Sequence, residues 1–296
     1  MNAARDARRL YSRLWKRACD ELGLSERTPV QLHHLLKHTG SFRKHEYDFH
    51  LAKNELMLRA ATSFFIFASI DLTHNLSPEK PRTRAMVSFL FSVSNLTLSF
   101  LTLNSRGLDF SMRVLARTLG EHCDLVRTFL FDPTICKQYL VDDPISANTF
   151  WHEHIAKGKL RDRFYSMAIN GDQINGEVLD DLKTLHQDEK EIERGLSNFA
   201  HPTWVGGMLN VLMRDFEETE ETGTSFDFLG RVGRRSIDIV HHVGFRLYFM
   251  QRLYWRRFQD GYFAAEGLSY DKSNISHDCL SVLDRVLDYL ASDLYK

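Results

Sequence analysis

Glycine and proline are scarce in this chain of 296 residues, which contains 16 glycines and 6 prolines. Together they make up about 7% of the residues, against roughly 12% in an average protein. Sandwiches, barrels and doubly wound sheets need many turns, so this scarcity argues against them. A strong net charge is also lacking: the formal value of −1 excludes a polycation built as a whole for nucleic acid. Because 43% of the residues are hydrophobic, a sizeable core is available. We predict an all-α fold, a multi-helix bundle.

Cysteine pairs and cofactor motifs are equally sparse. The four cysteines form no Cys-x-x-Cys pair, so they indicate neither a zinc ribbon nor a disulfide scaffold, and a reduced, cytoplasmic protein is the expectation. The chain has no Walker loop, GxGxxG or GxSxG motif, and its 14 histidines form no HExxH or Glu-x-x-His pattern. We therefore expect no cofactor and no bound metal.

The longest uncharged run extends over residues 85–105 and is long enough to span a bilayer. Nine of its 21 residues are serine, threonine or asparagine, however, which is too polar for a typical membrane helix. Serine and threonine can donate hydrogen bonds back to carbonyls of their own helix and so tolerate burial. We predict a buried helix of a bundle here and no stable membrane insertion. The arginine-rich start of the chain leads into no apolar segment typical of a secretory signal.

Apolar residues recur with the helical period along most of the chain. The segment 142–176 is more broken, and a subdomain boundary would fall there. No flexible linker marks it, so we predict one compact helical domain over 1–296. The predicted helices are 3–22, ended by Gly23; 29–36, opened by Pro29; 43–76; 84–104; 107–131, ended before Pro133; one opened by Pro144; 177–200, ended at Pro202; 204–219; 226–259; and 274–294.

The most specific local pattern lies at the end of the predicted helix 177–200. Arg194 and His201 are seven residues apart, two helical turns, and Asn198 lies between them on the same face. This pattern resembles the HEPN superfamily of helical bundles, whose nuclease members carry an arginine, four to six residues and then a histidine. The residue after the arginine is usually polar in those members and is Gly195 here. The resemblance implies metal-independent RNA cleavage by a dimer, in a bacterial defence or toxin system.

The residue types suit that chemistry. Histidine can move the proton of a ribose 2′-hydroxyl near neutral pH, and arginine can hold a phosphate and its developing charge. The alternative is structural: His201 would cap carbonyls at the end of the helix, and Arg194 would pair with Asp188 or Glu191.

A second stretch, 104–121, together with 197–202, is similar to a poorly characterised bacterial helical family with an Arg-x-x-x-Glu helix and a later Ser-x-x-x-His. This resemblance implies that Arg117, Glu121 and His201 share a site, with Arg113 in support. Arg117 and Glu121 are four residues apart and can pair on one helix face. The alternative is a buried ionic network that only fixes the packing of the helices.

Three functions remain open at this point. The first is a HEPN-like RNA-binding protein or endoribonuclease with RNA as its partner. The second is a non-catalytic helical adaptor that binds a partner protein, and the third is a membrane-associated helical protein that uses residues 85–105. Arginines alternate with aromatic residues in 226–259, a composition that suits RNA. We interpret these aromatics as core and the arginine stems as its edge.

Overall fold

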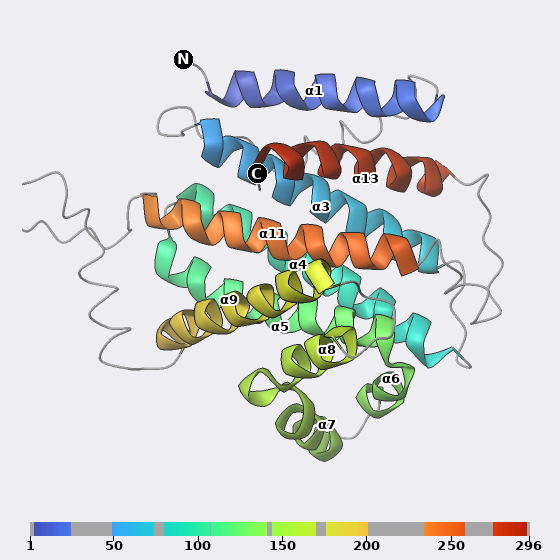
Figure 1. Ribbon diagram of the computed structural model, residues 1–296, viewed down its shortest axis with the longest axis vertical. Coiled ribbons are helices and arrows are strands. Elements are labelled where there is room, and N and C mark those ends of the chain that lie inside the picture. Colours follow the sequence, from blue (N-terminus) through green and yellow to red (C-terminus); the bar gives the residue numbers. More distant parts are fainter. Residues whose placement is uncertain are drawn as a thin grey trace, which may run out of the picture.

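The computed structural model of the chain is an all-α bundle (Figure 1). It describes residues 3–24, 49–73, 80–106, 108–140, 144–169, 176–200, 234–257 and 275–294, and within these ranges every regular element is helical. The predicted helices 29–36 and 204–219, the start of 43–76, the outer ends of 226–259 and His201 lie outside the described residues. The long helices are α1 (Ala3–Leu22), α3 (Phe49–Thr73), α4 (Pro81–Arg106), α5 (Asp109–Phe131), α9 (Gly176–Ala200), α11 (Arg234–Arg257) and α13 (Ile275–Leu294).

The helices are packed as a series of neighbours across the molecule. In Figure 1, α1 lies along one edge, followed by α13 and α3, then α11, and then α5 with α9 and α8 (Lys159–Ile169). The short α6 (Pro133–Tyr139) and α7 (Pro144–Phe150) and the turns η1 (Trp151–Ile155) and η2 (Ala156–Gly158) lie at the opposite edge. One hydrophobic cluster runs from α1 to α13, so these helices share a core.

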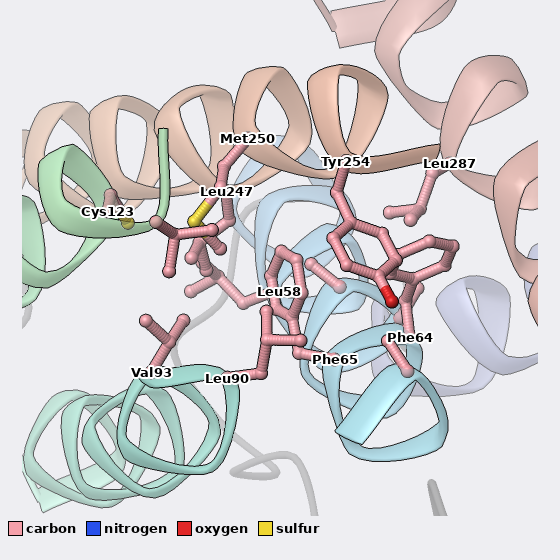
Figure 2. Close-up of a cluster of buried hydrophobic side chains, with 14 of the residues drawn as sticks. Leu58, Phe64, Phe65, Leu90, Val93, Cys123, Leu247, Met250, Tyr254 and Leu287 are labelled. Carbon is pink, nitrogen blue, oxygen red and sulfur yellow. The ribbon is translucent and has the colours of Figure 1, made fainter. Parts of the chain in front are cut away.

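The central helix α3 contacts α1, α4, α11 and α13 and is buried nearly all round. Figure 2 shows Leu58, Phe64 and Phe65 of this helix facing Leu247 and Tyr254 of α11. Phe64 meets the Tyr254 ring edge to face, with ring centroids 5.9 Å apart. Burial on all sides explains why α3 has no amphipathic pattern.

Prolines and glycines delimit the helices as the sequence predicts. Gly23 adopts a φ of +65° and ends α1, and the Leu24 N–H donates to the Cys19 carbonyl across 3.0 Å. Pro133 occupies the first turn of α6, where the Asp132 side chain accepts from the Thr134 N–H at 3.0 Å.

Helix α4, which contains the uncharged run 85–105, is buried on one face only, so the prediction of a buried helix is half right. By length and hydropathy His50–Thr73 and Pro81–Ser105 could each cross a membrane, and 78% and 50% of their apolar windows are buried in the bundle. Ser94 and Thr97 donate to carbonyls one turn back, as predicted. The outer face carries Ser88, Phe91, Asn95, Ser99 and Thr102.

Candidate functional site

A pocket of about 240 Å³ opens where α5, α8 and α9 meet the turn η2. These helices pack against one another, so the walls of the pocket belong to the folded core of this end of the molecule. Five of the lining side chains are basic and three are acidic. The pocket is lined by Arg117, Glu121, Asp124, Ile155, Lys157, Gly158, Leu160, Arg161, Lys190, Glu193, Arg194 and Ser197.

Helix α9 supplies one wall of the pocket. Lys190, Arg194 and Ser197 follow one another at four and three residues, so they share one face of the helix. Arg194 is exposed and Lys190 partly buried, and neither forms an ion pair with a described residue. The alternative pairing of Arg194 with Asp188 or Glu191 is therefore not present. Glu191 accepts instead from the Gln187 side chain at 2.7 Å.

The turn η2 supplies a third cation to the pocket. Lys157 and Gly158 adopt φ values of 64° and 74°, so the backbone reverses in the left-handed region before α8 begins. A Cβ on Gly158 would collide with the Arg161 guanidinium, which packs against this turn. Lys157 is exposed and makes no ion pair within the described residues.

Beneath the pocket lies a buried ionic network. Arg127 donates to both Glu189 oxygens at 3.0 Å and also to Asp124. Arg246 reaches Asp124 at 3.1 Å and Glu193 at 2.9 Å, and Glu193 also accepts from Arg161. The network joins α5, α8, α9 and α11, and it holds two of the three acidic groups of the pocket between pairs of guanidinium groups.

The carboxyl groups differ in their electrostatics. Burial alone would raise the pKa of Glu189, but the charges of Arg127 and Arg246 outweigh it and lower the pKa to about 2. Burial raises the pKa of Asp124, and the same two arginines offset this only in part. Burial also raises the pKa of Glu121, and the charge of Arg117, whose Nε lies 3.5 Å from a carboxylate oxygen, offsets this only in part.

Three of the site residues that the sequence singled out line this one pocket: Arg117, Glu121 and Arg194. Arg117 and Glu121 pair, as their spacing predicts. Arg113 is buried one turn before Arg117 and does not line the pocket, and neither does Asn198, which is partly buried near the end of α9. The site assignment itself stays a prediction.

Sequence reasoning missed Lys157 and Lys190, and it underrated Arg246. The interpretation that the arginine stems of 226–259 cover the edge of the core is wrong for Arg246, which is 3% exposed inside the ionic network. A signal was present on α5, where Asp124 and Arg127 lie three residues apart in the mostly apolar stretch 123–131. No such local signal marks Lys157.

Within the described part of the chain, no group of three or more histidine, cysteine or acidic side chains could hold a metal ion. Comparisons with protein-family models, with curated proteins and with solved structures found no match. The proposed function therefore rests on the charged side chains that line the pocket.

The side chain of His242 makes the stability of the fold depend on pH. It lies on α11 one turn before Arg246, and its Nε2 atom is sealed from solvent without a hydrogen-bond partner in the described residues. Burial, and then the Arg246 charge, lower the pKa of His242 to about 3. In the unfolded chain His242 takes up a proton near pH 6.5, whereas in the folded chain it stays neutral at that pH. The free energy of unfolding therefore falls as the pH drops below 6.5.

We expect the wild type to lose about 1 kcal/mol more than His242→Gln between pH 6 and pH 5, because the variant lacks this one titrating group. Urea unfolding of both proteins at the two pH values measures the difference. Equal losses would show that His242 titrates alike in the folded and unfolded chain.

Proposed function

We propose that this chain is an RNA-binding protein with a HEPN-like helical core and that it acts as a metal-independent endoribonuclease. One observation carries the proposal: Lys157, Lys190 and Arg194 line the same pocket and none has an ion pair within the described residues. Cations that pair with no carboxylate among the described residues favour an anionic ligand.

A phosphodiester suits this arrangement better than a carboxylate ligand does. Three cations from two separate elements surround one volume, so they can contact several oxygens of one phosphate or two successive phosphates. Arg194 presents a planar fork of donors and keeps its charge at every physiological pH, while the two lysines act as point charges.

The resemblance of Arg194 and His201 to the HEPN pattern supplies the chemistry of the proposal. Arg194 would hold the scissile phosphate, and His201 would transfer protons at the 2′-hydroxyl or the leaving oxygen. The same resemblance supports a homodimer, and the cysteine usage supports a cytoplasmic site of action; the proposal includes both.

Binding of a labelled single-stranded RNA, measured by fluorescence anisotropy, tests the pocket. We expect Arg194→Ala and Lys190→Ala each to weaken binding about tenfold at low salt, because each removes a charge-assisted phosphate contact. Each variant should also reduce the slope of log K against log salt by about 0.7.

Lys16→Ala is the charge-matched control, because Lys16 is exposed on α1, which packs on α3 and α13 at the other edge of the bundle (Figure 1). It should leave affinity almost unchanged. Equal losses in all three variants would mean that RNA responds to net charge and not to the pocket. If the wild type binds no RNA, the adaptor function takes precedence.

A further inference from the structure

The pocket contains an acid that a simple phosphate site would not need. Asp124 and Glu193 each pair with two guanidinium groups, so their negative charges are balanced inside the fold. Glu121 has a single ionic partner, Arg117, at 3.5 Å, and a third of its side chain is exposed at the pocket. No other hydrogen bond or ion pair to Glu121 is present in the described residues, so acceptor capacity on its carboxylate is left over.

A carboxylate that pairs with only one guanidinium still repels a phosphate, so its presence beside the three unpaired cations weakens the binding of any ligand that is only anionic. It favours a ligand that has a hydrogen-bond donor next to its phosphate. In a nucleic-acid strand the ribose 2′-hydroxyl is such a donor, and it is the group by which proteins distinguish RNA from DNA. Ionised carboxylates accept strong hydrogen bonds from hydroxyl groups.

We propose that Glu121 accepts a hydrogen bond from a ribose 2′-hydroxyl and thereby makes this pocket select RNA over DNA. The inference rests on the proposed function, because it assumes that Lys157, Lys190 and Arg194 bind the neighbouring phosphates. Arg117 pairs with Glu121 on the same helix, and the charge of its guanidinium opposes the burial that raises the Glu121 pKa. Glu121 thus discriminates among strands, and the three cations supply affinity for all of them.

The test compares one short single-stranded sequence made as RNA, as the uracil-containing 2′-deoxy strand and as 2′-O-methyl RNA. The last two have the same bases and phosphates but cannot donate from the 2′ position. We expect the wild type to bind RNA about tenfold more tightly than either, the usual effect of a hydrogen bond to a charged group. Glu121→Ala should bind all three with nearly equal affinity, mainly because it binds the two modified strands more tightly.

Glu191→Ala is the matched control. Glu191 is an exposed acid on α9 that does not line the pocket, so its removal should shift all three affinities equally and keep their ratio. Circular dichroism of both variants checks the fold, and Glu121→Gln, which keeps an acceptor oxygen, should retain part of the preference. If the wild type binds RNA and DNA alike, or Glu121→Ala keeps the RNA preference, the role of Glu121 is wrong while the phosphate pocket stands. If no strand binds, both proposals fall together.

Discussion

Replacement of His201 by alanine is expected to abolish RNA cleavage. Loss of a general acid or base costs about a hundredfold to ten-thousandfold in rate, which is far outside the scatter of a cleavage assay. Arg194→Ala should lose activity to a similar degree, because Arg194 lines the pocket as a cation without an ion pair in the described residues and would hold the charge that develops on the phosphate.

The measurement is cleavage of an end-labelled RNA in EDTA by the wild type and both variants. His50→Ala is the control, since His50 lies on α3, which contributes no residue to the pocket. The His50→Ala variant should cleave RNA at the same rate as the wild type. Full activity in His201→Ala would end the nuclease proposal. Wild-type activity that disappears in EDTA would replace it with metal-dependent cleavage.

Substitution of Arg127 by methionine is expected to destabilise the fold by about 3–5 kcal/mol, because it removes one of the two guanidinium groups that pair with the buried carboxylates Asp124 and Glu189. Arg127 is completely buried, donates to both oxygens of Glu189 and also contacts Asp124. Its guanidinium also lies 5.0 Å from the centre of the Phe164 ring, so packing is lost together with charge.

Urea unfolding followed by circular dichroism measures this change. Arg163→Met is the matched control: Arg163 pairs with Asp132 but its side chain is 41% exposed, so we expect a loss below about 1 kcal/mol. The double variant Arg127→Met/Glu189→Leu should be more stable than Arg127→Met alone, since it also removes a buried carboxylate that has lost its bidentate partner. Equal losses in Arg127→Met and Arg163→Met would show that the buried network contributes little.

The helices could be predicted from the sequence because their ends depend on local chemistry. Pro133 and Pro144 open helices, and Gly23 and Gly158 adopt positive φ where a helix or turn ends. The recurrence of apolar residues with a period of 3.6 predicted helices over the residues of α1 and α5. On α4 the prediction overestimated burial, because the sequence of an uncharged helix face with many serines does not show whether another helix covers that face.

The site was only partly predictable. Arg117 and Glu121 are neighbours on one helix, so their pairing follows from a spacing of four residues. Their position beside Arg194 depends on α5 packing against α9, and a sequence pattern contains no information on that contact unless a resemblance suggests it. Lys157 entered the pocket only because α8 folds back on α9 and brings the preceding turn with it.

Apart from α6 and α8, which were not predicted, the order and approximate ends of the described helices follow from composition, periodicity and the places of proline and glycine, as does the exclusion of sheet folds. These are local properties that each segment has before it meets any other. Only the tertiary structure determined which charged side chains form ion pairs within the described residues and which do not. Arg246 and Arg194 look alike in the sequence, yet Arg246 is neutralised by Asp124 and Glu193 in the core, while Arg194 faces an open pocket. Charge interactions act across space, and the partners of Arg246 lie 122 and 53 residues away along the chain.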